Sequence, residues 1–280
     1  MIVSKQTLLF LIIVFCFITG LAQTKKTYFN KRWDKTNADS AVYLREITPD
    51  AEMFKVVEYY LASNKVYSKG TYVDKRLKKK QNKFEYFHEN GNLMKLESYN
   101  AEGNLEGQSQ TFYCDNKVDS EGYFKNGKMH GEWKWYHSNG QLASKEIYNQ
   151  GIITEINFWD ETGKVMPAKL GDEIKAPRFG VDEEGAQRYL YSKITFPEAA
   201  RYVSNSGRVL LNFTIEADGN ISDVFVELSL DNVLDAETIR AARLMPRWKA
   251  GVCHNRQSRT ENVLVPVFYK LMMSNLERNW

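Results

Sequence analysis

The chain has 280 residues, which is enough for two domains of ordinary size. Hydrophobic residues make up 43% and charged residues 26% of it, a composition typical of folded rather than disordered proteins. The formal net charge of +3 is too small to indicate a nucleic-acid partner, and we expect none.

The N-terminus has the pattern of a secretory signal peptide spanning residues 1–22. Lys5 supplies a positive charge, residues 8–18 are all apolar, and the tripeptide GLA ending at Ala22 is a small-x-small cleavage site. We therefore expect cleavage after Ala22. The alternative is a retained anchor through residues 8–21, although this stretch is shorter than the roughly 20 residues that a spanning helix needs. Membrane association is expected only if the segment is retained.

The stretch that follows the signal peptide is less regular. Residues 24–58 have a mixed composition, and we expect an irregular strand or two between residues 40 and 60. The basic run at residues 75–80 is predicted to be a solvated loop. Contact with acidic lipid or polysaccharide is the alternative for this run.

An aromatic pattern then repeats with a period near 24 residues. It reads FEYFHENG at residues 84–91 and WKWYHSNG at residues 133–140, with weaker copies at residues 111–116 and 156–163. Each period holds two short aromatic strands and two glycine turns, and therefore one β-hairpin. A single hairpin is not stable alone, so the hairpins should stack into a long antiparallel meander.

Proline and glycine cluster at residues 166–180, which we predict to be a linker. The helix expected after it has Asp182, Glu183 and Glu184 in its first turn, where acidic side chains suit the helix dipole.

The last part of the chain alternates between strand and helix periodicity. A first strand is predicted at residues 207–217, where every second residue is apolar. The Asp218-Gly219 turn leads to a second strand at residues 221–229. A helix should run from Asn232 until Pro246 stops it. We expect the aromatic side chains of this part to pack the helix on the sheet: Phe213, Phe225 and Trp248.

A third strand at residues 263–269 contains Pro266, which removes one hydrogen-bond donor from the ladder. Proline is found mainly on edge strands, so this strand should lie at a sheet edge. An exposed edge is a template for another strand. The residues predicted to bind a partner in this way are Val263, Leu264, Val265, Val267, Phe268 and Tyr269.

No constellation of catalytic or metal-ligating residues stands out. His88 and His137 share one repeat position, His130 sits in a glycine turn, and His254 stands alone after Cys253. A metal site needs three or four converging ligands, so we expect no metal. Asp235 and Glu237 on the helix are interpreted as solvent-facing or capping residues rather than as an acid/base pair. We predict no catalytic residue and no cofactor. The tryptophans of the repeats should form the apolar face of the sheet, with a carbohydrate-stacking surface as the alternative: Trp133, Trp135 and Trp159. Cys114 and Cys253 fall in different halves of the chain and are expected to stay free rather than to pair.

Three motifs give the C-terminal part a family resemblance. They are DGNISDV at residues 218–224, MPRW at residues 245–248 and VPV at residues 265–267. This part resembles the C-terminal domain of the TonB energy-transducer family. The resemblance implies a non-enzymatic peptide-binding module in transport across the outer membrane, which pairs with a segment of a receptor by strand addition.

The repeats resemble the MORN-type family, in the variant known from antitoxin-like proteins. The motif is clearest in KMHGEW at residues 128–133 and YHSNG at residues 136–140. Such repeats indicate architecture and leave function open, because they serve as scaffolds in many contexts.

We predict a β-rich protein in which a MORN-like antiparallel β-meander is followed by a small α+β TonB C-terminal-like domain. The expected boundaries are residues 23–165 for the repeats, 166–180 for the linker and 181–280 for the C-terminal domain. The predicted partner is an outer-membrane TonB-dependent receptor or another envelope protein, and the predicted location is the periplasm. An inner-membrane anchor through residues 8–21 is the alternative location. The alternative function is a protein-binding scaffold, an antitoxin- or immunity-like adaptor without energy transduction.

Overall fold

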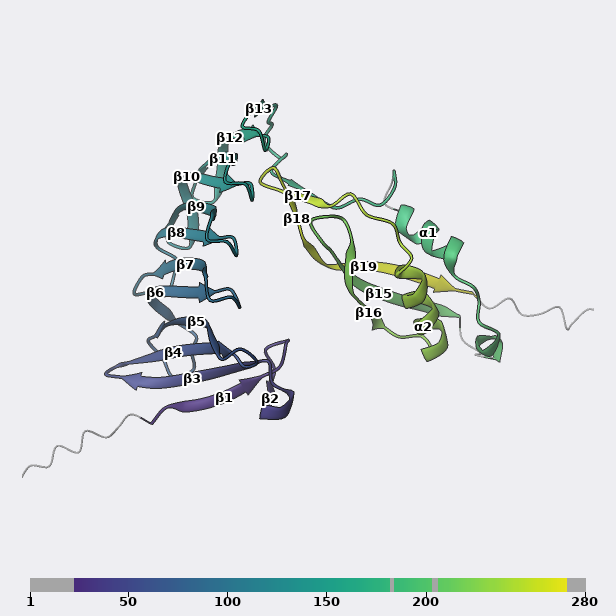
Figure 1. Cartoon of the computed structure of the whole chain (residues 1–280), viewed down its shortest axis with the longest axis horizontal. Helices are drawn as coiled ribbons and strands as arrows, with labels where there is room; N and C mark the ends of the chain where they lie inside the picture. Colours follow the sequence, from purple (N-terminus) through teal and green to yellow (C-terminus); the bar gives the residue numbers. More distant parts are fainter. Residues whose placement is uncertain (1–22, 182–183, 203–205, 271–280) are drawn as a thin grey trace, which may run out of the picture. The chain divides into compact units, whose positions relative to one another are not determined.

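The structure is a computed structural model that describes residues 23–181, 184–202 and 206–270 (Figure 1). The predicted signal peptide therefore lies outside the described residues. Within the described ranges, no helix is both long and apolar enough to cross a membrane.

Most of the described chain is an antiparallel β-meander, as predicted. In the first sheet each strand follows its sequence neighbour from β13 back to β3, and β1 and β2 complete the order β3-β1-β2. The strands are β1 Lys25–Phe29, β2 Lys35–Thr36, β3 Tyr43–Asp50, β4 Met53–Tyr60, β5 Lys65–Tyr72, β6 Lys80–Phe87, β7 Leu93–Tyr99, β8 Gly107–Phe112, β9 Val118–Lys125, β10 Lys128–Tyr136, β11 Leu142–Asn149, β12 Ile152–Trp159 and β13 Val165–Met166. A short 3₁₀ helix, η1 (Ala38–Ser40), lies between β2 and β3.

The chain divides into two compact units, which we describe separately. One consists of Met1–Ser109 with Cys114–Asn116, and the other of Gln110–Tyr113 with Lys117–Trp280. The second unit thus contains the later repeats together with the C-terminal strands and helices. The domain boundary expected at residues 166–180 stays a prediction.

Two features recur in the repeats: glycine turns, and side chains that bond to the main chain of the next repeat. Gly140, in the turn after β10, has a φ of 90°, which favours glycine. Next to this turn, His137 Nε2 lies 2.9 Å from the carbonyl oxygen of Trp159, and Tyr113 donates from its hydroxyl to the carbonyl oxygen of Tyr136 at 2.6 Å. His137 and Tyr113 occupy the same repeat position, so each links its strand end to the next repeat. The repeat position of the histidines therefore has a structural role.

The C-terminal part is a small α+β arrangement within the second unit. Its elements are β14 Ile174–Lys175, α1 Gly185–Lys193, η2 Glu198–Tyr202, β15 Gly207–Ile215, β16 Ile221–Leu228, α2 Asn232–Ala242, β17 Gly251–Cys253, β18 Arg256–Ser258 and β19 Thr260–Tyr269. One sheet has the order β16-β15-β19, and a second has the order β14-β17-β18. The three predicted strands and the second predicted helix are therefore present. The structure adds β14 from the predicted linker, together with β17 and β18.

Local sequence explains the boundaries of these elements. The β15–β16 turn closes with a hydrogen bond from Glu216 N to Asn220 O at 2.8 Å, and Gly219 adopts a φ of 84°. A Cβ at Gly219 would also come within 2.1 Å of the Trp248 carbonyl oxygen, so this position requires glycine. The side chain of Asp231 caps α2 by accepting hydrogen bonds from the first turn of the helix.

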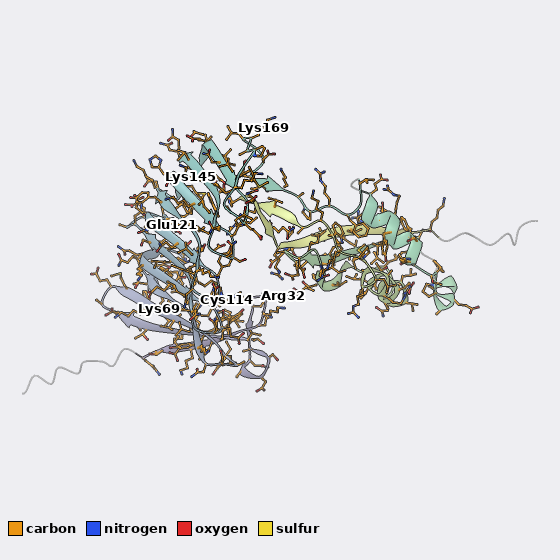
Figure 2. The ribbon with its side chains drawn as sticks, turned by 45° about the horizontal axis from the view of Figure 1, so that its top comes forward. Arg32, Lys69, Cys114, Glu121, Lys145 and Lys169 are labelled. Atoms are coloured by element: carbon orange, nitrogen blue, oxygen red, sulfur yellow. The ribbon has the colours of Figure 1, made fainter. Side chains whose placement is uncertain are left out.

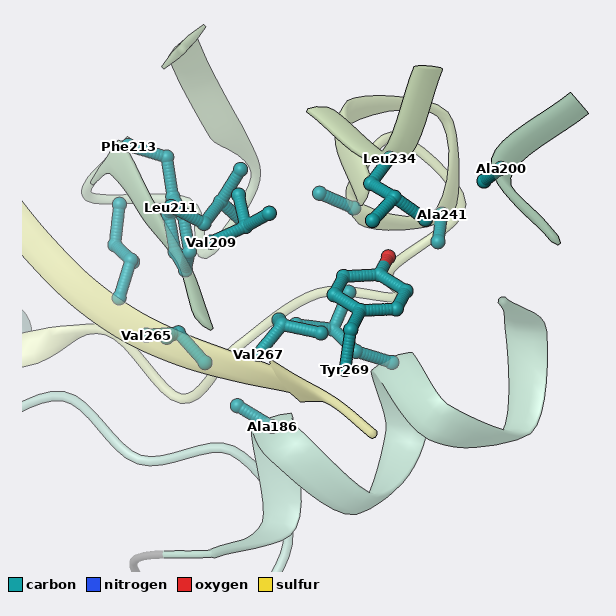
Figure 3. Packing of buried hydrophobic residues seen from close by; sticks show 13 residues of the cluster. Ala186, Ala200, Val209, Leu211, Phe213, Leu234, Ala241, Val265, Val267 and Tyr269 are labelled. Atoms are coloured by element: carbon teal, nitrogen blue, oxygen red, sulfur yellow. The ribbon is translucent and has the colours of Figure 1, made fainter. Parts of the chain in front are cut away.

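The core of this part lies between the β16-β15-β19 sheet and the two helices (Figure 3). Leu211 and Phe213 of β15 and Val267 of β19 are 0%, 1% and 0% exposed. Leu190 of α1 and Leu234 of α2 pack against them, at 0% and 2% exposure.

Two details of the sequence prediction need correction. Phe225 was expected in the core but is 38% exposed, because Val224 and Val226 are the β16 side chains that pack inward. Phe213 and Trp248 do pack in the core, with ring centroids 5.5 Å apart. Helix α1 begins at Gly185 with Glu184 as its cap residue, so it starts later than expected, and residues 182–183 lie outside the described part.

Both cysteines in the described ranges are free thiols. Cys114 is exposed in the turn after β8 (Figure 2), and Cys253 is half-buried in β17.

Candidate partner-binding edge

Strand β19 forms one edge of the three-stranded sheet. It pairs antiparallel with β15, with Val267 opposite Val209 and Pro266 opposite Leu210. Among the described strands, none pairs with its other side. The edge position expected from Pro266 is therefore confirmed.

The side chains of β19 alternate between the core and the solvent. Val265, Val267 and Tyr269 are 7%, 0% and 7% exposed, whereas Leu264 and Phe268 are 50% and 55% exposed. Val263 is half-buried against the core cluster. Of the six residues predicted to bind a partner, four therefore pack in or against the core, and only the apolar side chains of Leu264 and Phe268 point to the solvent.

The main-chain groups on the open side of β19 can be assigned from two hydrogen bonds. Gln187 donates from Nε2 to the carbonyl oxygen of Pro266 at 2.7 Å. The amide of Phe268 donates to the hydroxyl oxygen of Tyr191 at 3.0 Å. Both Pro266 and Phe268 therefore direct their main-chain groups away from β15. Because a strand repeats every two residues, those of Leu264 point the same way.

Both of these partner side chains come from α1, whose neighbouring residues anchor the helix. Ala186 and Leu190 are 4% and 0% exposed and join the core cluster. Figure 3 shows Ala186 of α1 close to Val265 of β19. Gln187 and Tyr191 are four residues apart, so they lie on one face of the helix and reach one strand. The sequence contains this spacing, but it does not reveal which strand that helical face meets.

Apolar side chains are also exposed on the solvent face of the sheet beyond β19. Phe225 and Leu228 of β16 are 38% and 46% exposed, and they add to the exposed area of Leu264 and Phe268. The register places Asn212 opposite both Phe225 and Leu264, so these two side chains flank the central strand.

The turn between β17 and β18 contacts the last repeats, which belong to the same compact unit. His254 stacks on Trp135 of β10, with ring centroids 3.7 Å apart and an interplanar angle of 9°. Its Nδ1 lies 2.8 Å from Oε1 of Glu146, a residue that is 0% exposed. His254 and Asn255 have φ values of 51° and 60°, as a two-residue hairpin turn requires. We call His254, Asn255 and Arg256 the hairpin tip.

The rest of the hairpin tip binds main-chain and acidic groups of the repeats. Asn255 donates from Nδ2 to the carbonyl oxygen of Trp159 at 2.8 Å. Arg256 donates from Nη1 to the carbonyl oxygen of Tyr136 at 2.9 Å and forms an ion pair with Asp119. The hairpin tip therefore fixes the C-terminal part to the last repeats.

The contact between His254 and Glu146 sets the charge of both groups. Burial lowers the pKa of His254, but hydrogen bonds with Cys253 and Glu146 and the Glu146 charge outweigh it and raise this pKa to about 9. Burial raises the pKa of Glu146, but hydrogen bonds from His254, Ser144 and Tyr148 outweigh it and keep this pKa below its ordinary value. The pair is therefore an imidazolium and a carboxylate at neutral pH.

An earlier repeat has the same buried carboxylate but another partner. Glu97, at 4% exposure, is bound by Lys95 Nζ at 2.5 Å and by the Tyr99 hydroxyl at 2.9 Å. In the later repeat the place of Lys95 is taken by Ser144, and His254 supplies the cation. Sequence analysis missed this role of His254, because its partners lie more than a hundred residues away along the chain.

The tryptophans of β10 form part of a buried cluster rather than an open stacking surface. Trp133 and Trp135 are each 4% exposed, and Tyr148 packs beside them. The expectation of an apolar face is confirmed for these two residues. Among the described residues, no group of three or more histidine, cysteine, aspartate or glutamate side chains could hold a metal ion.

Family models match two segments of the chain. Residues 192–271 match the family described as the Gram-negative bacterial TonB protein C-terminal. Residues 80–101 and 129–150 match the MORN repeat variant family. A search of curated proteins finds none that matches the chain.

Solved structures similar to the chain include two solution structures of the TonB C-terminal domain of Helicobacter pylori. Each is 27% identical to this chain. They cover 34% and 30% of this chain and 88% of their own, with TM-scores of 0.26 and 0.24. The two family matches therefore identify MORN-variant repeats within the β-meander and a TonB C-terminal match over the α+β part that follows it.

Proposed function

We propose that the C-terminal domain binds an outer-membrane receptor or another envelope protein by strand addition to β19, as part of TonB-type transport. The observation that supports this most is the edge position of β19 inside the segment that matches the TonB family. Leu264 and Phe268 are exposed along this edge. In this proposal the protein is exported to the periplasm and acts as a non-enzymatic binding module.

Strand addition draws its affinity from main-chain hydrogen bonds, while side chains on alternate positions give specificity. The open side of β19 offers the main-chain groups of Leu264, Pro266 and Phe268. Pro266 can accept but cannot donate, so a paired strand forms one bond fewer at this position than elsewhere.

A scaffold function is the second candidate, and the hairpin tip favours it. A transducer of the TonB type has a long extended spacer, whereas here the C-terminal part is bound directly to a folded repeat array through His254 and Glu146. An adaptor without energy transduction would fit that arrangement. Intact-mass measurement on the protein from its native envelope distinguishes the two, because transduction needs residues 1–22 to be retained as an anchor.

We expect Leu264→Pro to weaken the binding of an extended peptide by roughly 10- to 100-fold. The proline removes an outward amide worth about 0.5–1.5 kcal/mol, and its ring clashes with the incoming strand. The probe is a short synthetic peptide of alternating valine and threonine with a lysine at each end, titrated by calorimetry.

Leu264→Thr is the matched control, because it changes the same side chain but keeps the main-chain donor. It should weaken peptide binding only a few-fold. Equal loss in both variants would show that side-chain contact rather than strand pairing holds the peptide. No change in either variant would place the peptide away from β19.

A further inference from the structure

We infer that α1 covers the open edge of β19 and that a partner strand binds by displacing the side chains of Gln187 and Tyr191. This inference rests on the proposed function, and it specifies how that site is opened and what kind of segment fits it. The partner is an extended peptide segment with apolar residues opposite Leu264 and Phe268.

The two contacts of α1 occupy main-chain groups that an added strand needs. Gln187 supplies a donor to the oxygen of Pro266 at 2.7 Å, and Tyr191 supplies an acceptor to the amide of Phe268 at 3.0 Å. An incoming strand would offer an amide and a carbonyl at the same two places. Helix and partner strand therefore compete for the same hydrogen bonds.

Few contacts anchor α1 to the rest of the domain. The helix has nine residues, of which Ala186 and Leu190 are buried. A helix of this length is marginal alone, so its stability comes from packing. The Tyr189 hydroxyl adds one bond to the carbonyl oxygen of Leu244 at 2.6 Å. Only a few contacts of α1 therefore have to break before the edge of β19 is free to pair with another strand.

The exposed side chains of β19 define the partner's chemistry. Residues of an added strand that lie opposite Leu264 and Phe268 share the solvent face with them. Leu264 and Phe268 are 50% and 55% exposed, so apolar side chains of the added strand at these positions would bury surface that is now exposed to solvent. The alternate residues would face the side of the sheet where Ala186 and Leu190 now pack. A β-branched segment with few charges fits both faces.

Covering the edge lowers the apparent affinity of any strand partner. When only a fraction of molecules has an open edge, the apparent Kd is the intrinsic Kd divided by that fraction. Removing one contact of α1 raises the open fraction, so it should tighten peptide binding although no contact with the peptide is added.

The test titrates the alternating valine and threonine peptide against wild type, Gln187→Leu and Tyr191→Phe. Each variant should bind roughly 2- to 10-fold more tightly, which corresponds to the loss of one net hydrogen bond. The matched control is Ser192→Ala, which removes the 2.6 Å hydrogen bond from Ser192 Oγ to the carbonyl oxygen of Tyr189 on the same helix. It leaves both edge contacts in place and should bind as wild type does.

Amide hydrogen exchange gives a readout without any peptide. In Tyr191→Phe the amide of Phe268 should exchange several-fold faster, while the amide of Val267, which faces β15, should keep its wild-type rate. Unequal effects at these two amides would show local opening of the edge. Equal acceleration at both would mean that the whole strand loosens, and the inference would be wrong.

The possible failures are distinguishable. If the peptide protects the Leu264 amide equally well in wild type and both variants, strand addition stands but the cover by α1 does not. If no variant binds the peptide, the proposed function itself fails. If the variants associate with one another instead, the occupant of the edge is a second copy of this chain, and the inference about a separate partner is overturned.

Discussion

Glu146→Ala should lower the free energy of unfolding of the second unit by about 3–5 kcal/mol, because it removes a buried carboxylate and leaves its three side-chain hydrogen-bond partners unsatisfied. Glu146 is 0% exposed, and it accepts hydrogen bonds from Ser144 and Tyr148 at 2.7 Å each, as well as contacting His254. Without this carboxylate, burial lowers the pKa of His254, so the imidazole that stacks on Trp135 loses both its charge and its partner. The hairpin tip then loses the contact that holds it to the repeats.

Urea denaturation followed by tryptophan fluorescence measures this effect. Glu132→Ala is the matched control, since Glu132 also pairs with a cation, Lys134 Nζ at 2.9 Å, but its side chain is 44% exposed. An exposed ion pair contributes about 0–1 kcal/mol, so the control should hardly change stability. If both variants lost a similarly small amount of unfolding free energy, the hairpin tip would not be what fixes the C-terminal part to the last repeats.

The same contact predicts a loss of stability at alkaline pH. The pKa of His254 rises from 6.5 to about 9 on folding, so its contribution is complete below pH 6.5 and is lost as the pH rises through about 9. The pKa of Glu146 is lowered, so its contribution is lost only on the acid side of 4.5. The titratable groups around the imidazole are Glu146 and Cys253, with Tyr148 and Glu173 next to them.

Urea titrations from about pH 6 to about pH 10 test this dependence. Wild type should lose stability across that range, whereas His254→Asn, which cannot titrate, should show a flatter curve. An unchanged slope in His254→Asn would show that another group is responsible.

Phe213→Ala should destabilise the C-terminal domain by about 3–5 kcal/mol. Phe213 is 1% exposed on the central strand, and the centroids of its ring and of the Trp248 ring are 5.5 Å apart. Alanine would leave a cavity in the middle of the core between the sheet and the helices. Chemical denaturation monitored by circular dichroism measures the change.

Phe225→Ala is the internal comparison, since Phe225 is 38% exposed on the solvent face of the same sheet. We expect a loss of less than about 1 kcal/mol for this variant. A loss at Phe225 as large as that at Phe213 would contradict the inward orientation of Val224 and Val226 in β16.

Local patterns in the sequence were enough to predict the elements that depend on local chemistry. The repeat of aromatic strands with glycine turns predicts the meander, and the Asp218-Gly219 turn predicts the β15–β16 hairpin. Pro266 predicts the edge, because a residue without an amide donor is tolerated there. In each case a backbone requirement within a few residues determines the outcome.

Features that depend on distant contacts were not predictable in this way. Phe225 and Val224 alternate in β16, and only the register with β15 determines which of them packs inward. The partners of His254 are Trp135 and Glu146, which lie in another part of the sequence. The contact of Tyr191 with β19 likewise depends on how α1 packs against the sheet.

The central claim is that β19 is the strand to which a partner peptide adds. Amide hydrogen exchange of the protein with and without the alternating peptide tests it most directly. The account predicts new protection at the outward amide of Leu264 and stronger protection at that of Phe268, which now donates to Tyr191, with no change at Val265 and Val267, which already pair with β15. Peptide-dependent protection confined to the repeats, with Leu264 and Phe268 unchanged, would contradict it.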